Sequence, residues 1–86
     1  TNYPNPFNPV TTINYYISED SRVNIEIYDL MGRSIKSLFN ESQEAGYQSI
    51  KWDATNNRNE AVSSGLYLYT IQADGSIQTS KMVLLK

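Results

Sequence analysis

Apolar and polar side chains alternate with a period of two over most of this chain, a pattern typical of strands that bury one face. The first such segment begins at Thr11, where Ile13, Tyr15 and Ile17 alternate with polar positions and with Tyr16. A short acidic turn follows before the alternation resumes. This pattern predicts a strand whose odd-numbered side chains lie in a core.

The second alternating segment carries Val23, Ile25 and Ile27 on one side. It ends at residues 29–32, where Gly32 supplies a residue that readily adopts a positive φ. We therefore predict a hairpin that leads into a third strand over residues 34–39.

Residues 40–46 are polar and predict a turn before the next strand. In that strand Gln48, Ile50 and Trp52 share one side, so Trp52 is expected to anchor the core. Residues 53–64 are rich in Asn, Asp, Ser and Thr and lack a periodic apolar signal, which predicts a long loop.

The last part of the chain predicts a hairpin. Tyr67, Tyr69 and Ile71 alternate with Leu66, Leu68 and Thr70. Asp74-Gly75 is a strong turn signal, and residues 76–85 form the returning strand. No window has apolar residues at helical spacing over three turns. About six strands and no helix predict an all-β, antiparallel sandwich.

Length and composition limit the possibilities further. Eighty-six residues allow one domain with one modest core, so residues 1–86 are treated as a single unit. Residues 1–10 form a Pro-rich N-terminal segment in which Phe7 is expected to pack over one end of the core. No export signal is recognisable, and the chain resembles a piece cut from the end of something longer.

Charge and residue types exclude several functions. The net charge is −2 and the basic residues are scattered, so no basic stripe suits a nucleic acid. The chain has no Cys and no His, which excludes the common catalytic triads and Cys-ligated zinc and predicts that it is not an enzyme. The longest aliphatic run, residues 82–85, is far too short for a membrane span.

Two binding sites are weighed against purely structural roles. Oxygen-bearing side chains in the predicted loop suggest calcium, although their spacing is not that of an EF-hand and the usual role of such residues in loops is to form hydrogen-bonded turns. They are Asp53, Asn56, Asn57, Asn59 and Glu60. Tyr16, Tyr28 and Trp52 suggest a sugar-binding platform, whereas alternation favours core packing for such rings. No other cofactor is indicated.

Several segments together resemble the C-terminal sorting domain of the type IX secretion system. They are NYPNPFNP at residues 2–9, TTINYYI at 11–17, VNIEIYDLMGR at 23–33, SGLYLYTI at 64–71 and KMVLLK at 81–86. The resemblance implies an Ig-like sandwich of six to seven strands. It also implies a non-catalytic module at the C-terminus of a larger secreted protein of a Gram-negative bacterium.

The resemblance further implies partners and recognition residues. The partners would be the outer-membrane secretion translocon, an associated sortase-like peptidase and an N-terminal cargo domain, with a final location at the cell surface or in the medium. The family's motifs fall on Gly65, Tyr67, Lys81 and Lys86.

A related resemblance is to the Ig-like domain of flagellar hook-assembly proteins, which shares the Trp-Asp step and the Gly-x-Tyr-x-Tyr strand. The NPFNP segment and the KMVLLK ending favour the sorting domain. A carbohydrate-binding accessory module and a structural Ig-like spacer remain the alternatives.

Overall fold

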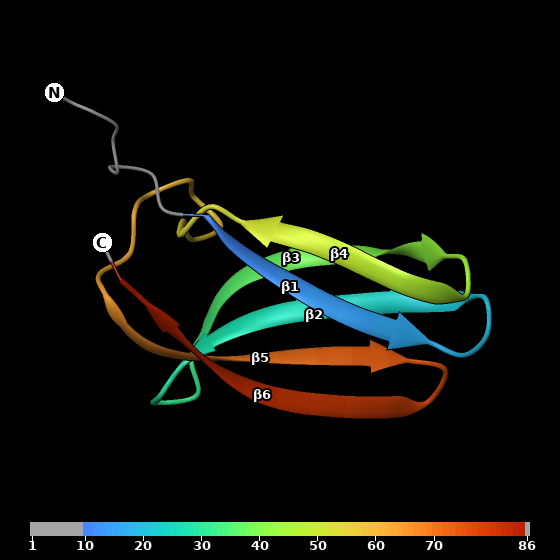
Figure 1. Ribbon diagram of the computed structural model, residues 1–86. Helices are drawn as coiled ribbons and strands as arrows, with labels where there is room; N and C mark the ends of the chain where they lie inside the picture. Colours follow the sequence, from blue (N-terminus) through green and yellow to red (C-terminus); the bar gives the residue numbers. More distant parts are fainter. Residues whose placement is uncertain (1–9, 86) are drawn as a thin grey trace, which may run out of the picture.

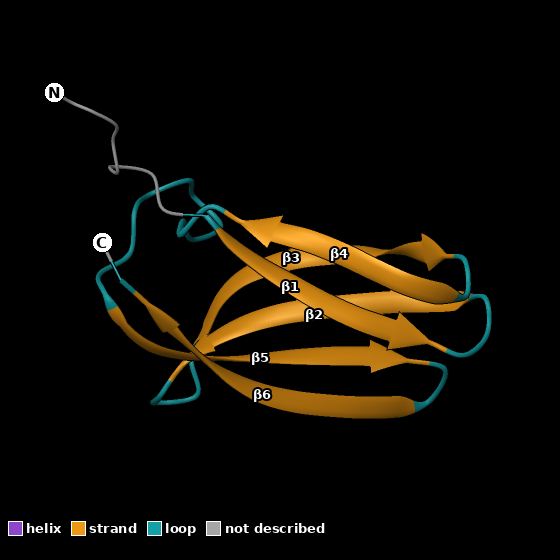
Figure 2. Cartoon of the chain, viewed as in Figure 1, coloured by secondary structure: helices purple, strands orange, loops and turns teal. Residues whose placement is uncertain are grey.

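The computed structural model describes residues 10–85, which form six strands and no helix (Figure 1, Figure 2). The all-β prediction is therefore confirmed. The strands are β1 (Thr11–Ile17), β2 (Ser21–Asp29), β3 (Ser34–Gln43), β4 (Gly46–Trp52), β5 (Gly65–Ala73) and β6 (Ser76–Leu84). Within this part of the chain no helix exists that is long and apolar enough to cross a membrane. Phe7, which was predicted to pack over one end of the core, and Lys86, which was predicted to carry recognition, lie outside the described residues.

The strands form two antiparallel sheets of unequal size. β1 and β4 make a two-stranded sheet in which Ile13 lies opposite Ile50, and the larger sheet has the order β3-β2-β5-β6. Figure 1 shows β1 and β4 together as one layer beside the larger sheet. Because the chain crosses between layers after β1, β3 and β4, the strands of the small sheet come from distant parts of the sequence.

The core lies between the two sheets and is built by the predicted alternation. Val23, Ile25 and Ile27 of β2 are 0% exposed, since β2 has a strand on each side and its inner face is covered by β1 and β4. Ile13 and Ile17 of β1 face them. The remaining buried core residues are Tyr15, Trp52, Ala54, Tyr67, Ile71 and Leu84.

Two of the predicted turns form as expected. Gly32 has φ +86°, and the Asp29 carboxylate accepts hydrogen bonds from the amides of Met31 (2.9 Å) and Arg33 (3.0 Å). The backbone hydrogen bond from Arg33 is the main reason why the pKa of Asp29 lies below its ordinary value. Asp74 and Gly75 have φ of 51° and 79°, which matches the two positive φ angles of a type I′ hairpin turn.

β3 is longer than the apolar pattern indicated. It continues to Gln43 through residues that we expected in a polar turn, and Ser21 of β2 lies opposite Gln43. As an edge strand β3 needs only backbone pairing with β2, so its polar side chains carry no penalty. The Tyr15 hydroxyl donates to Gln43 Oε1, and burial raises the pKa of that hydroxyl.

Truncation of a side chain on the central strand tests this core. Ile25→Ala is expected to lower the free energy of unfolding by about 2–5 kcal/mol, because the cavity at a fully buried site cannot fill with water. Ile77→Ala removes a side chain that is 64% exposed, and the expected loss is within about 0.5 kcal/mol. Urea unfolding followed by Trp52 fluorescence measures both; equal losses would contradict this description of the core.

The Asp29 turn predicts a pH dependence. The pKa of Asp29 is lower in the folded domain than its ordinary value, so the ionised carboxylate stabilises the fold. This stabilisation is fully present above the ordinary carboxyl pKa and is lost as the pH falls through the pKa of the folded state. Asp29→Asn keeps an acceptor oxygen but removes the charge, so its stability is expected to fall less steeply between about pH 5 and pH 2. Urea midpoints across this range measure the slope. Glu41→Gln, at an exposed position of edge strand β3, is the control. Its pH dependence of stability is expected to stay closer to that of the parent than that of Asp29→Asn.

Candidate functional site

An aromatic pair lies where the loop of residues 53–64 leaves β4 and enters β5. Trp52 and Tyr67 meet edge to face, with ring centroids 5.3 Å apart and an interplanar angle of 73°. Trp52 is 0% and Tyr67 6% exposed, so both rings belong to the core. This geometry is the favoured arrangement of two aromatic quadrupoles. The pair joins the last residue of β4 to the third residue of β5.

The same pair fixes both ends of the loop. Trp52 Nε1 donates to the carbonyl of Thr55 (2.9 Å), and the Tyr67 hydroxyl donates to the carbonyl of Ser63 (2.6 Å). Tyr67 was predicted to carry recognition, but in the folded domain its ring is inside and its hydroxyl holds the loop. Gly65 is exposed with φ +154°, and an added Cβ would meet no atom within 4 Å. The backbone angle is therefore what favours glycine at this position.

The side chains that suggested calcium are engaged in hydrogen bonds within the loop and to β3. Asn56 Oδ1 accepts hydrogen bonds from the amides of Arg58 (2.9 Å) and Glu60 (3.0 Å). Asn56 Nδ2 donates to Glu60 Oε1 (3.0 Å), and Asn57 Oδ1 accepts from the amide of Ser37 (2.9 Å). The Asn56 bonds form turns of the kind that Asn makes in loops, whereas the Asn57 bond ties the loop to β3.

Two residues of the same predicted set complete this description. Asp53 Oδ1 accepts from the Thr55 hydroxyl (2.5 Å), and Asn59 adopts φ +62°. Among residues 10–85 no group of three or more acidic side chains is placed to hold a metal ion. Calcium binding stays a prediction, for which the loop offers turn geometry only.

The three rings proposed as a sugar platform are not brought together. Trp52 is in the core, Tyr28 is half-buried on the outer face of β2, and Tyr16 projects from β1. Tyr16 instead contacts Tyr47 of β4, with centroids 5.0 Å apart and an interplanar angle of 55°. Tyr47 was not among the residues predicted from the sequence. It is separated from Trp52 by an odd number of positions in β4, so the alternation already placed its side chain on the outer face of that strand.

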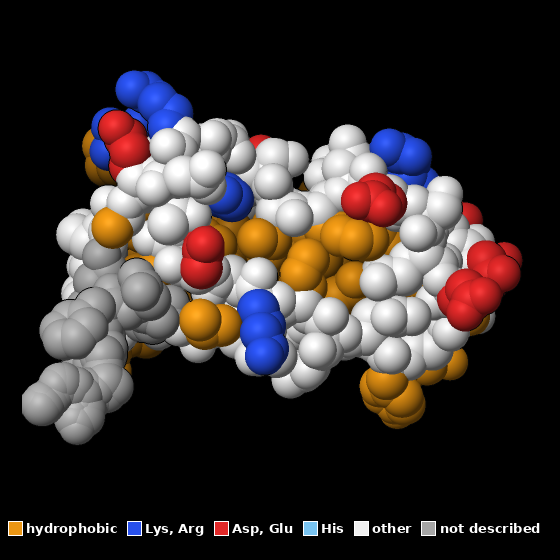
Figure 3. All heavy atoms as spheres, turned by 90° about the horizontal axis from the view of Figure 1, so that it is seen from above, with side chains coloured by type: hydrophobic (Ala, Val, Ile, Leu, Met, Phe, Trp, Pro, Cys, Tyr) orange, Lys and Arg blue, Asp and Glu red, His pale blue; other side chains and the backbone are white. Residues whose placement is uncertain are grey.

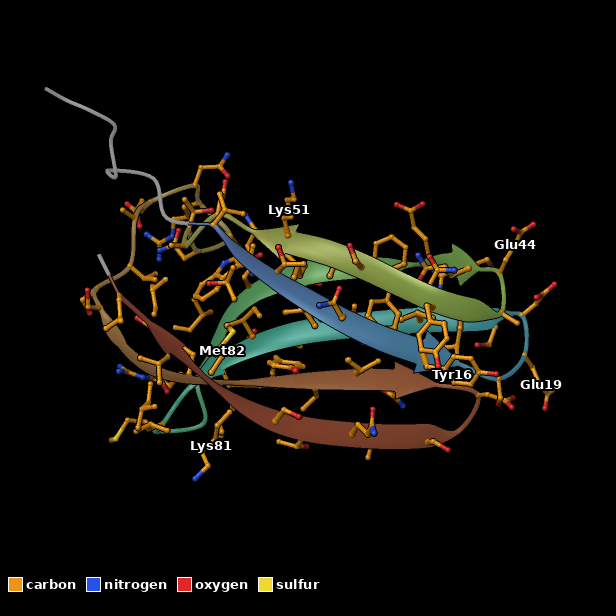
Figure 4. The ribbon with its side chains drawn as sticks, in the orientation of Figure 1. Tyr16, Glu19, Glu44, Lys51, Lys81 and Met82 are labelled. Atoms are coloured by element: carbon orange, nitrogen blue, oxygen red, sulfur yellow. The ribbon has the colours of Figure 1, made fainter. Side chains whose placement is uncertain are left out.

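β6 is an edge strand with two different faces. Leu84 is 1% exposed and Met82 lies opposite Tyr67, so these side chains attach the strand to the core. Lys81 and Val83 alternate with these residues and are exposed. Figure 4 shows Lys81 pointing away from the sandwich. Within residues 10–85 β6 pairs with β5 alone, which leaves its second edge open.

The opposite side of the sandwich is also incompletely covered. Figure 3, seen from above, shows apolar side chains along a shallow depression between polar borders. The half-buried apolar residues of β3 and β4 are Ile35, Leu38, Phe39 and Ile50. A two-stranded layer is too narrow to cover a four-stranded sheet completely.

Removal of one hydroxyl tests the role of Tyr67. Tyr67→Phe keeps the ring against Trp52 but leaves the Ser63 carbonyl without this donor, so we expect a loss of about 1 kcal/mol in unfolding free energy. Tyr69→Phe is the control, because the Tyr69 hydroxyl has no hydrogen-bond partner among the described residues. Its expected effect is within about 0.5 kcal/mol. Urea unfolding measures both, and a neutral Tyr67→Phe would show that the hydroxyl does not hold the loop.

Similar proteins support this description of the fold. The family model of the FlgD Ig-like domain matches residues 9–76. The crystal structure of FlgD from P. aeruginosa superposes with a TM-score of 0.72 at 22% identity, over 88% of this chain and 60% of that one. Dimeric latent PorU from Porphyromonas gingivalis gives a TM-score of 0.67 at 27% identity, over 94% of this chain and 8% of that one. No curated protein matches the chain in sequence.

The chain thus spans less than two thirds of either solved structure. The family match covers most of the chain, from the residue before Val10 to the first residue of β6. Of the two resemblances found in the sequence, the flagellar one is confirmed at the level of the family. The chain belongs to the FlgD Ig-like domain family.

Proposed function

We propose that this domain is a non-catalytic sorting module that directs a larger exported protein through the type IX secretion system, and that its partner recognises β6. Its partners are the outer-membrane translocon, the sortase-like peptidase associated with it and the cargo domain that it carries. The final location of the cargo is the cell surface or the medium. The observation that carries the proposal is that β6 is an edge strand, attached to the core by one face and open on the other.

The region shared with the flagellar family supports this choice of strand. The family match ends at Ser76, so nearly all of β6 lies beyond it. The segments of the sequence that favour a sorting domain, residues 2–9 and 81–86, also lie outside or at the margin of that match. A function that differs from that of the common Ig-like domain is expected to use such additional segments.

The chemistry of β6 suits recognition by strand addition. A partner strand beside an open edge gains main-chain hydrogen bonds, and pockets for alternate side chains provide specificity. Lys81 and Val83 point the same way and supply one cation and one apolar contact. Leu84 is buried and holds the strand in place during such an encounter.

A domain of this fold can be one part of a longer protein, as the proposal requires. PorU matches this chain over only 8% of its own length, so a domain of this fold occurs within a much larger chain. The absence of His and Cys from the sequence is consistent with recognition rather than catalysis.

A structural Ig-like spacer is the second candidate. Membership of the FlgD Ig-like family favours it, as does the finding that Tyr67 serves the packing of its loop. A spacer needs a stable fold and two attachment points, but it needs no particular side chains on the outer face of β6.

Localisation of a reporter distinguishes the two. A fluorescent protein with an export signal and this domain at its C-terminus is expected outside the cell when the translocon is intact, and in the periplasm of a translocon-deficient strain. The variant K81E/V83D alters only outward side chains of β6, and we expect at least about a tenfold reduction in secreted reporter. Cell fractionation quantifies each pool.

The matched control is K51E/T12D. Lys51 and Thr12 are paired and exposed on the outer face of the small sheet, so acidic residues are introduced away from β6. Figure 4 shows Lys51 projecting outward from β4. Normal secretion of this variant and equal urea midpoints for all three domains are expected. A reporter that stays periplasmic in both strains would remove the sorting proposal in favour of the spacer.

A further inference from the structure

Tyr16 and Tyr47 form an exposed aromatic surface at one end of the small sheet. Their strands place them directly opposite one another, and they are 59% and 88% exposed. Two large rings in contact with each other and with water are an unusual use of aromatic area in a small domain. They lie at the end remote from Trp52, where β1 stops and β4 starts.

A shallow cavity of about 270 Å³ opens beside Tyr16. It lies between the free edge of β1 and the inner faces of β5 and β6. Its polar rim and walls come from Tyr16, Ser18, Glu19, Asp74, Ser76 and Gln78. Ser76 and Gln78 are on the inner side of β6 but remain exposed, because the small sheet does not extend over that strand.

The cavity combines the groups that recognise a sugar ring. A tyrosine at the rim offers a flat apolar face to the C–H side of a pyranose, and Ile71 and Ala73 give the cavity an apolar floor. Carboxylates accept hydrogen bonds from sugar hydroxyls, whereas the amide of Gln78 both donates and accepts. A few convergent polar groups around an apolar surface are typical of small-ligand sites.

The charges around the cavity favour a neutral glycan. Glu19 and Asp74 line it, and Glu44 lies at the same end of the domain (Figure 4). No Lys or Arg is among the lining residues. Arg22 is held towards β3 by Asn40, through bonds to Oδ1 (3.2 Å) and the carbonyl oxygen (3.0 Å). An anionic polysaccharide would therefore meet repulsion without a compensating cation.

We propose that this end of the domain binds a neutral oligosaccharide, with Tyr16 and Tyr47 as the stacking surface and the adjoining cavity as the hydrogen-bonding subsite. The site uses the outer face of the small sheet and the inner side of β6. The sorting proposal uses the outer face and the open edge of β6, so each can fail without the other.

Titration of the isotopically labelled domain by NMR tests the site. The probes are cellopentaose, maltopentaose and N-acetylchitopentaose, with tetragalacturonate as the anionic comparison, at up to about 10 mM. We expect saturable shifts with at least one neutral probe, confined to residues 16–19, 47 and 74–78. The anionic probe is expected to give none.

Variants separate stacking from a general effect of mutation. Tyr47→Ala removes the more exposed ring, and about tenfold weaker binding is expected, whereas Tyr47→Phe keeps the ring and is expected to stay within about twofold. Asp74→Asn tests the hydrogen-bonding subsite and is expected to weaken binding by about fivefold. Unchanged urea midpoints show that each variant folds. No saturable shift with any neutral probe, or a Tyr47→Ala variant that binds as well as the parent, would overturn the proposal.

Discussion

The contact between Trp52 and Tyr67 is the interaction on which the rest of the structure depends. The two sheets share no backbone ladder among the described residues, so their inner faces are held together by side-chain packing. Trp52 is the largest fully buried side chain and comes from the small sheet, and Tyr67 comes from the large one. Their edge-to-face packing closes one end of the core, and their polar atoms fix the loop that joins the sheets.

The unequal size of the sheets explains where surface remains for other tasks. A two-stranded layer covers β2 and β5 well, since Ile25 and Ile71 are buried, but it leaves β6 and part of β3 open. The proposed saccharide site follows from that incomplete cover, whereas the proposed sorting surface follows from the position of β6 at the edge of the large sheet. The sorting surface uses the free edge of β6, and the saccharide site uses the space that the small sheet leaves between β1 and β6.

Family membership and the proposed function concern different parts of the chain. The FlgD Ig-like match covers the strands that supply most of the core of this chain and its aromatic pair. β6 lies almost entirely beyond the match and contributes one fully buried anchor, Leu84. The common scaffold is thus compatible with different roles, and the terminal strand is where this chain can differ.

The sequence by itself determined the local structure, because its signals are local. Alternation placed Ile13, Val23 and Ile25 inside, and Asp74-Gly75 determined a hairpin through its backbone angles. Only the tertiary structure decided which strands pair. β1 joins β4, far along the chain, because their inner faces together cover the large sheet, and this register makes Tyr16 and Tyr47 neighbours. No short segment encodes that register, since it depends on how two distant apolar faces fit over a third.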